Sequence, residues 1–246
     1  MVTTDRYVSC VMPTMASRRW CLPHAIRYWQ RQTYQFSELV VMTDGADPGV
    51  EDLIPADPRI RYVHVTEALA LSDKYNRLVE QTRYPWIALW ADDDWQASWR
   101  LGYTMGQLRE RREIAGLRKM IFHRIGTLES WLYETPKPTT EPYFLGGSIV
   151  FHRQYWERHP FPSGKRSRAD ASFTNDIDPD EYARVAVVLE DPTFYVAMNH
   201  GNNVGRSKQS PLRPEQNHVM GWSWYDGDVR NLLGDDAEIY CPRIRS

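Results

Sequence analysis

Residues 86–95 read WIALWADDDW, an apolar run that passes directly into the carboxylates of Asp92, Asp93 and Asp94. A short continuous apolar run is typical of a strand that is buried on both faces, as strands in parallel sheets are. In such sheets, ligands bind outside the carboxyl ends of the strands. A buried strand that ends in three acidic residues therefore predicts both an α/β fold and a binding site at that edge of the sheet.

The residues before this stretch alternate between strand and helix patterns. Apolar, β-rich runs occupy residues 7–12, 38–43 and 61–65, and helical patterns occupy residues 22–32 and 72–82. Strands separated by helices indicate βαβ units. We therefore predict a Rossmann-like α/β fold with a mainly parallel central sheet flanked by helices.

The second half of the chain has a mixed pattern. It begins with a helical pattern at residues 98–112, and residues 161–180 are polar and rich in Gly, Ser and Asp, which favours a flexible segment. After His200 the sequence is irregular. Since no linker divides the chain, we expect one domain whose second half completes the sheet and covers one of its faces. The further elements expected are strands at residues 119–124, 128–133, 148–152, 185–189 and 193–198 and a short helix at residues 154–159.

The composition is that of a globular chain. Its 246 residues are 42% hydrophobic and 25% charged, which excludes disorder and a coiled coil. The 30 Lys and Arg residues against 32 Asp and Glu give a net charge of −2, so no overall basic field attracts nucleic acid or anionic lipid. Basic clusters at residues 109–112 and 165–168 could still contact an anion, although a solvated surface is the commoner explanation.

Cysteine usage and hydropathy bear on the compartment. The three cysteines, Cys10, Cys21 and Cys241, have no CxxC spacing, which argues against a disulfide framework and a zinc site. The first residues lack the pattern of a signal peptide. No apolar run approaches the ~18 residues of a membrane span. We therefore expect a cytoplasmic protein without a transmembrane segment.

The three adjacent carboxylates at residues 92–94 repel one another, and a divalent cation relieves this repulsion. Oxygen ligands suit Mg²⁺ or Mn²⁺, which commonly bridge to the phosphates of a substrate. The alternative is a solvated acidic turn that caps the next helix. The position of the carboxylates at a strand end favours the metal.

Three further residues have suitable chemistry. Asp44, at the end of the second predicted strand, could accept hydrogen bonds from a base or a ribose, or could be an ordinary residue of an Asp-Gly turn. His200 could bind a metal or face a diphosphate, or could be structural. Asp170 could act as a general base beside a substrate hydroxyl. Its acidic neighbours compete for that role: Asp176, Asp178, Asp180 and Glu181.

Together these motifs resemble the nucleotide-sugar-dependent glycosyltransferases of the GT-A fold, family 2 type. Residues 8–48 are similar to that family's strand–PT–helix–QTY–EL–strand–DG pattern, and residues 86–95 to its strand and DxD-type motif. The segment YFLGGSIVFHRQYWERHPF at residues 143–161 resembles its acceptor-side segment. Shorter likenesses are KYNR at residues 74–77 and HGNN at residues 200–203. The resemblance covers about residues 7–205.

The resemblance implies roles for particular residues. Residues 1–246 would form a single GT-A domain, with a nucleotide-sugar-binding half at about 1–115 and an acceptor-binding half with a C-terminal extension at about 116–246. Asp170 would deprotonate the acceptor hydroxyl, and one in-line displacement would invert the anomeric configuration. The donor-binding residues would be Pro13, Thr14, Asp44, Lys74, Asn76 and Asp92; the metal ligands Asp93, Asp94 and His200; and the acceptor-side residues Gly146 and Gly147.

The resemblance also implies the substrates. The donor is a nucleoside-diphosphate sugar, most simply a UDP-sugar, and the cofactor is Mn²⁺ or Mg²⁺. The acceptor is unknown; a nucleic acid is an alternative that is not favoured, and the chain could form a homo-oligomer. The chain departs from the family pattern at Ala91, Thr43 and Ala169, where the family often has acidic residues.

Two other functions compete with sugar transfer. A metal-dependent nucleotidyltransferase would share the α/β sheet and the acidic site. It normally needs a Gly-rich, basic loop after the first strand; Arg18 and Arg19 fit this requirement, but no glycine is present there. A non-catalytic nucleotide- or sugar-binding module is the other alternative, and Ala91 would be consistent with it.

Overall fold

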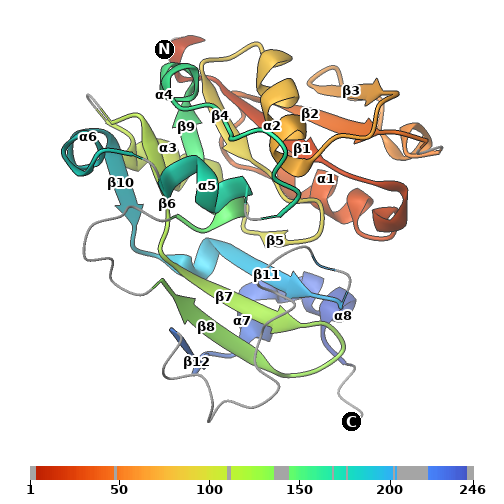
Figure 1. Cartoon of the computed structure of the whole chain (residues 1–246). Helices are drawn as coiled ribbons and strands as arrows, with labels where there is room; N and C mark the ends of the chain where they lie inside the picture. Colours follow the sequence, from red (N-terminus) through yellow and green to blue (C-terminus); the bar gives the residue numbers. More distant parts are fainter. Residues whose placement is uncertain are drawn as a thin grey trace.

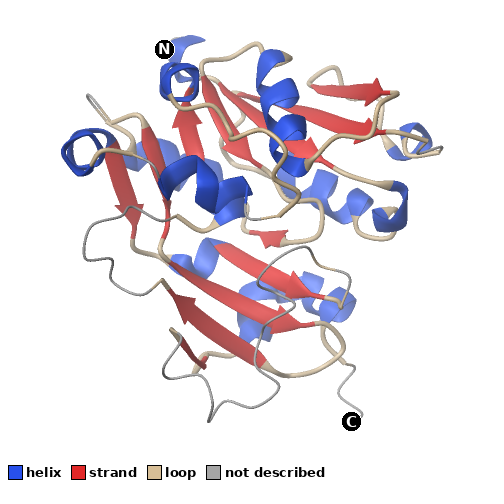
Figure 2. Ribbon diagram, in the orientation of Figure 1, coloured by secondary structure: helices blue, strands red, loops and turns tan. Residues whose placement is uncertain are grey.

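The computed structural model of the chain describes residues 4–46, 49–109, 112–135, 144–167, 169–175, 177–201, 203 and 221–242. Within these residues, two sheets lie one above the other in the view of Figure 1, and helices flank both (Figure 2). The larger sheet has seven strands and the smaller has five.

The larger sheet is mainly parallel. Its strands are β1 (Val8–Pro13), β2 (Ser37–Asp44), β3 (Ile60–Val65), β4 (Trp86–Leu89), β6 (Ile114–Leu117), β9 (Val150–His152) and β10 (Ala186–Leu189). They lie in the order β10-β6-β9-β4-β1-β2-β3. Every pair is parallel except the two made by β9, which runs antiparallel to β4 and to β6. The predicted parallel sheet is therefore confirmed.

Helices cover both faces of this sheet. They are α1 (Leu22–Gln30), α2 (Leu71–Glu80), α3 (Arg100–Gln107), α4 (Arg153–Arg158), α5 (Ala169–Asn175) and α6 (Pro179–Val185). Successive residues of a strand point to opposite faces. Accordingly, Cys10 and Met12 of β1 join the apolar cluster that contains α1 and α3, whereas Val11 joins the cluster that contains α2, α4 and α5. This two-sided burial explains why the strands read as continuous apolar runs.

The order of the strands locates a binding edge. From β1 the chain passes to β2 and β3 on one side, and then returns to place β4 on the other side of β1. The connections leave β1 and β4 in opposite directions, so a crevice opens at the carboxyl ends of these two strands. Pro13 ends β1 at this crevice and Thr14 follows it, and residues 91–94 follow β4.

The smaller sheet lies below the larger sheet in the view of Figure 1 and is mixed. Its strands are β5 (Trp95–Gln96), β7 (Lys119–Arg124), β8 (Ser130–Glu134), β11 (Tyr195–Asn199) and β12 (Trp222–Trp224), in the order β12-β8-β7-β11-β5. The last helices, α7 (Val229–Leu233) and α8 (Ala237–Tyr240), pack near α1. Asp236, just before α8, forms ion pairs with Arg27 and Arg31, both at 2.6 Å.

The second half differs from its prediction in three ways. Besides adding β6, β9 and β10 to the large sheet, it builds most of a second sheet. Residues 161–180, where we expected a flexible segment, contain α5, and its Phe173 stacks on Phe161 at 4.0 Å between ring centroids. The segment after residue 220, expected to be irregular, contains β12, α7 and α8. None of the described helices has the length and apolar character needed to cross a membrane.

Candidate functional site

A cavity of about 380 Å³ lies at the crevice. Its wall combines the ends of β1 and β4 with α2, α5 and strands of the smaller sheet, and its volume is in the range of small-molecule sites. Among the lining residues are Pro13, Thr14, Arg18, Lys74, Tyr75, Asp92, Asp93, Asp94, Gly146, Gly147, Arg166, Asp170 and Tyr195. The fold thus brings most of the sequence-predicted site residues to one cavity.

The carboxylates of Asp92 and Asp93 are buried and share a single cation. Arg18, at the end of the 3-10 turn that follows β1, places its Nη1 atom 2.6 Å from Asp92 Oδ1, and the same nitrogen forms an ion pair with Asp93 Oδ2. Burial raises the pKa of Asp92 to about 6, against the opposing effect of Arg18. Burial also acts to raise the pKa of Asp93, but hydrogen bonding from His200 and the charge of Arg18 outweigh it and lower that pKa.

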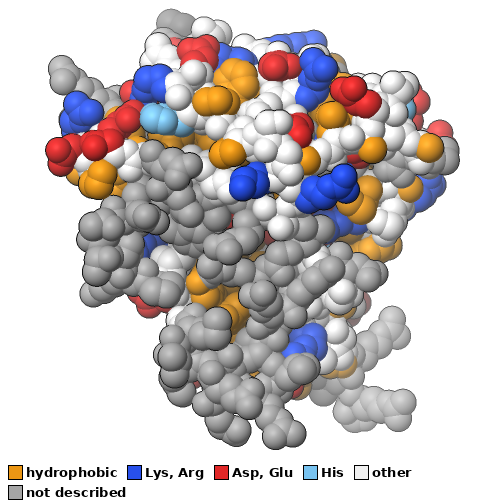
Figure 3. Space-filling view, in the orientation of Figure 1, with side chains coloured by type: hydrophobic (Ala, Val, Ile, Leu, Met, Phe, Trp, Pro, Cys, Tyr) orange, Lys and Arg blue, Asp and Glu red, His pale blue; other side chains and the backbone are white. Residues whose placement is uncertain are grey.

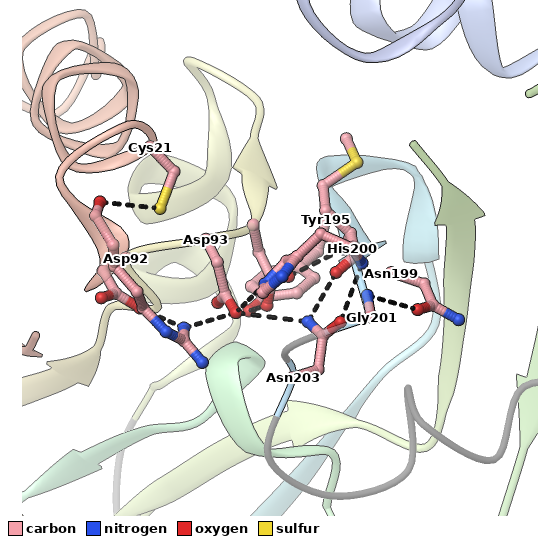
Figure 4. A network of polar contacts seen from close by, with 11 residues as sticks. Cys21, Asp92, Asp93, Tyr195, Asn199, His200, Gly201 and Asn203 are labelled. Atoms are coloured by element: carbon pink, nitrogen blue, oxygen red, sulfur yellow. Dashed lines mark hydrogen bonds and ion pairs between the residues drawn. The ribbon is translucent and has the colours of Figure 1, made fainter. Parts of the chain in front are cut away.

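Asp93 is held from the other side by the segment after β11. The His200 ring donates from Nε2 to Asp93 Oδ2 at 3.1 Å, and the Asn203 amide donates to the same oxygen at 3.3 Å. Asn203 Oδ1 in turn accepts the backbone N–H of His200 at 2.8 Å. Figure 4 shows Asp93 between Asp92 on one side and His200 and Asn203 on the other. His200 does not line the cavity itself and contacts it through Asp93.

Asp94 is anchored to β11. The Tyr195 hydroxyl donates to Asp94 Oδ2 at 2.5 Å, and the backbone N–H of Met198 donates to Oδ1 at 2.8 Å. Burial, with a contribution from Asp93, raises the pKa of Asp94 to about 8. Both oxygens of Asp94 therefore connect the loop after β4 to the smaller sheet.

The residues predicted for the donor nucleotide fall into two groups. Pro13, Thr14 and Lys74 line the cavity, and Asp44 is next to them because it forms an ion pair with Lys74 and accepts the Leu69 N–H at 2.7 Å. Asn76 lies outside the cavity. Its amide donates to the Phe161 carbonyl at 2.8 Å, and its oxygen accepts the Trp156 indole N–H at 2.8 Å.

The acceptor-side residues surround Asp170, which lies in the first turn of α5. The backbone N–H of Gly146 donates to Asp170 Oδ2 at 3.0 Å. A Cβ atom on Gly146 would lie 2.7 Å from that oxygen, and a Cβ atom on Gly147 would overlap the Tyr195 hydroxyl. A side chain at Gly146 would therefore displace the Asp170 carboxylate, and one at Gly147 would displace the Tyr195 ring.

The acidic neighbours of Asp170 have other contacts. Asp178 caps α6 by accepting the N–H groups of Asp180 and Glu181, each at 3.0 Å. Glu181 pairs with Arg158 at 3.2 Å. None of these side chains lines the cavity, and Asp176 lies outside the described residues.

The arrangement fits a divalent ion that is shared with a substrate. In the described part of the chain, no three His, Cys, Asp or Glu side chains are grouped to hold an ion by themselves. Mg²⁺, however, is commonly held by one or two carboxylates together with substrate phosphates. Asp92 Oδ2 is buried at the cavity wall without a hydrogen-bond partner among the described groups, and is therefore suited to such an ion.

Among the lining residues that the sequence did not assign to this site are Arg18 and Tyr195, which contact the acidic cluster. The sequence suggests Arg18 only as part of a basic loop that binds phosphate, because its one local signal is that two arginines follow residue 17. Tyr195 gives no signal, because it lies in a strand with an ordinary apolar pattern. Both residues reach the cavity through contacts with residues about 75 to 100 positions away.

Comparison with known proteins agrees with this architecture. A solved structure of TarS from S. aureus, in complex with UDP-GlcNAc, superposes with a TM-score of 0.61 at 13% identity, covering 85% of this chain and 63% of that one. The mannosyltransferase PcManGT from Pyrobaculum calidifontis, in complex with GDP-Man and Mn²⁺, gives a TM-score of 0.57 at 15% identity, covering 83% and 61%. The chain therefore spans less than two thirds of either structure, and at these identities the likeness shows the fold.

The sequence itself identifies the family. No curated protein matches the chain. The family model described as "Glycosyl transferase family 2" matches residues 9–168, about two thirds of the sequence, from β1 through the acidic cluster and β9 to the residues before α5. Because this match spans well over half of the sequence and contains the cavity's acidic edge, the chain belongs to glycosyl transferase family 2.

Proposed function

We propose that the chain transfers a single sugar from a nucleoside-diphosphate sugar to an acceptor hydroxyl, with inversion at the anomeric carbon. One observation carries the proposal: a single cavity at the switch point of the sheet is lined both by the acidic cluster at residues 92–94 and by Asp170. The first can hold the diphosphate through a divalent ion, and the second can accept the proton of the acceptor. Both requirements of an inverting transfer therefore meet in one place.

The donor would occupy the side of the cavity next to β1. Thr14 and the ion pair between Asp44 and Lys74 would contact the nucleoside, and Asn76 would support this wall through its bonds to Phe161. The structural neighbours were solved with UDP-GlcNAc, UDP and GDP-Man, which supports a nucleoside-diphosphate sugar as the ligand class. We take a UDP-sugar as the first candidate.

Asp93 would hold Mn²⁺ or Mg²⁺, with Asp94 and His200 behind it. We add Asp92, which the resemblance assigns to the donor, as a second ligand, because its Oδ2 has no hydrogen-bond partner among the described groups. When bound, such an ion would neutralise the negative charge that grows on the departing diphosphate. His200 keeps Asp93 oriented by donating to it, and would itself help to stabilise that charge. Asp94 fixes the loop through Tyr195, which keeps the acidic cluster at the cavity wall.

Asp170 would be the general base. Its carboxylate is oriented by the Gly146 amide and lines the cavity. It would take the proton of the acceptor hydroxyl as the oxygen forms its bond to the anomeric carbon, while the bond from that carbon to the diphosphate oxygen breaks. Because attack and departure occur on opposite faces, the configuration inverts.

Basic and acidic side chains are mixed over the described part of the face in Figure 3, which gives no reason to favour a nucleic-acid acceptor.

A panel of nucleotides tests the proposal. UDP, GDP, CDP and dTDP are added to the full chain with and without Mn²⁺, and the melting temperature is measured. A ligand at about 100 times its Kd adds about 2.7 kcal/mol of stability, so one diphosphate should raise the melting temperature, and should do so only with Mn²⁺. Stabilisation by nucleoside triphosphates alone would instead indicate a nucleotidyltransferase.

A further inference from the structure

Arg18 occupies an unusual place in this site. It belongs to the 3-10 turn η2 (Ala16–Arg18), yet its side chain is only 12% exposed and its guanidinium reaches the acidic cluster after β4. A single nitrogen, Nη1, contacts both carboxylates, Asp92 at 2.6 Å and Asp93 as a second ion pair. The Nη1 atom therefore places positive charge between two carboxylate oxygens, which is where a metal ion lies when two carboxylates share it.

The neighbouring Arg19 provides a comparison within the chain. It carries the same charge one residue further on, but it is exposed and donates to the carbonyl of Gly49, away from the acidic cluster. Of these two neighbouring arginines, Arg19 makes a contact at the surface and Arg18 makes a buried one. The position of Arg18 is therefore specific to its side chain and does not follow from a general attraction of basic residues to the cluster.

The buried carboxylates need a cation. Two charged groups removed from water are strongly destabilising unless they are paired, and removing the partner of a buried ion pair leaves an uncompensated buried charge. Of the two carboxylates, His200 and Asn203 contact Asp93, and Arg18 is the charged partner that contacts Asp92 among the described groups. In the absence of donor, Arg18 therefore neutralises part of the cluster's charge. A divalent ion that approaches the same oxygens is repelled by the positive charge of Arg18.

We propose that, in the donor-free protein, the Arg18 guanidinium occupies the position of the divalent ion between Asp92 and Asp93. It leaves this position only when the ion binds together with a nucleoside diphosphate. This inference rests on the proposed function. The guanidinium lines the same cavity, and guanidinium groups bind phosphate oxygens well, so the incoming diphosphate gives Arg18 a new partner as it leaves the carboxylates. Binding of metal and binding of nucleotide are then coupled, each strengthening the other.

The test is a Mn²⁺ titration of the full chain, followed by the electron paramagnetic resonance signal of the free ion. It is carried out with and without UDP, or GDP if the nucleotide panel selects it. Wild type should bind Mn²⁺ alone at least tenfold more weakly than Mn²⁺ with the nucleotide. Arg18→Gln should bind Mn²⁺ alone at least tenfold more tightly than wild type, and the nucleotide should add little. Arg19→Gln, which removes the same charge outside the cluster, should behave as wild type.

Each outcome has a definite meaning. Unchanged affinity of Arg18→Gln for Mn²⁺ alone would overturn the inference, even if nucleotide binding is intact. If that variant does not fold, as judged by circular dichroism, Arg18→Met, which removes the charge but keeps an unbranched side chain, is titrated in its place, and unchanged affinity for Mn²⁺ alone in that variant likewise overturns the inference. Failure of every nucleotide to bind wild type would instead contradict the proposed function itself.

Discussion

The backbone N–H of Gly146 donates to the Asp170 carboxylate at 3.0 Å, joining the turn before β9 to the first turn of α5. This contact brings together two residues 24 positions apart, and a Cβ atom at Gly146 would come within 2.7 Å of the same oxygen. The turn therefore both orients the carboxylate and leaves room for it. This relationship favours Asp170 over the other acidic residues of its segment as the base.

Replacing Asp170 by Asn should separate binding from chemistry. The amide keeps the shape of the side chain but cannot accept the acceptor proton, and general base catalysis typically contributes 10²–10⁴-fold. We expect Mn²⁺-dependent nucleotide binding to be retained and turnover to fall by ~100-fold or more, measured by melting temperature and initial rates. Asp178→Asn is the control, because Asn caps a helix as well as Asp does and residue 178 lies outside the cavity. A near-wild-type rate for Asp170→Asn would place the base elsewhere.

Gly147 should not tolerate a side chain. A Cβ atom there would overlap the Tyr195 hydroxyl, which holds Asp94. We expect Gly147→Ala to lower the unfolding free energy by about 1–3 kcal/mol through overpacking, measured by urea unfolding. Gly106→Ala in α3 is the matched control, since nothing lies within 4 Å of its Cβ position and alanine favours helices. Equal effects of the two substitutions would contradict the role of the Tyr195 contact.

Asp93 should be required for metal-dependent binding. Asp93→Ala removes a buried carboxylate that also receives bonds from His200 and Asn203. We expect the increase in nucleotide affinity on adding Mn²⁺ to be lost, measured by isothermal titration calorimetry. Asp57→Ala serves as the control, because Asp57 bonds to Arg59 outside the site. Retention of the full Mn²⁺ effect in Asp93→Ala would rule out Asp93 as a ligand.

His123 should make the fold sensitive to acid. The ring is fully buried in β7, and its burial lowers the pKa below the ordinary value of 6.5. Below about pH 6.5 the unfolded chain takes up a proton that the folded chain does not, so stability is present above this pH and is lost as the pH falls. Each unit of pKa difference corresponds to about 1.4 kcal/mol.

Urea unfolding at pH 7, 6 and 5 checks this expectation. Wild type should lose more stability over this range than His123→Gln, whatever the absolute stability of the variant. Parallel pH profiles for the two proteins would show that His123 does not titrate as expected.

The fold and the acidic edge of the site could be predicted because their signals are local. The strand at residues 86–89 and the carboxylates after it are contiguous, and burial on both faces produces a readable apolar run. The contacts made across the fold could not be predicted. Arg18 reaches Asp92 over 74 positions, and Tyr195 reaches Asp94 over 101. Nothing in the sequence near Asn76 shows that its amide turns to Phe161 instead of the cavity.

The end of the chain was missed for a different reason. β12, α7 and α8 contain three, five and four residues. These lengths are too short for a period of two or 3.6 to be recognised, and the elements are stabilised by long-range packing, such as the 5.5 Å stacking of Trp224 on Trp131. Their formation depends on the sheet against which they pack.

The most direct test of the account is to follow sugar nucleotides by NMR in the presence of the protein and Mn²⁺. UDP- and GDP-sugars are incubated with wild type and with Asp170→Asn, together with a panel of monosaccharide and alcohol acceptors that supply the attacking hydroxyl. The ³¹P and ¹H spectra report the released diphosphate and the anomeric configuration of the sugar product. Wild type should transfer the sugar of one donor, release its nucleoside diphosphate and invert the anomeric centre, while the variant should bind the donor without consuming it. Binding without consumption by wild type, or retention of configuration, would contradict it.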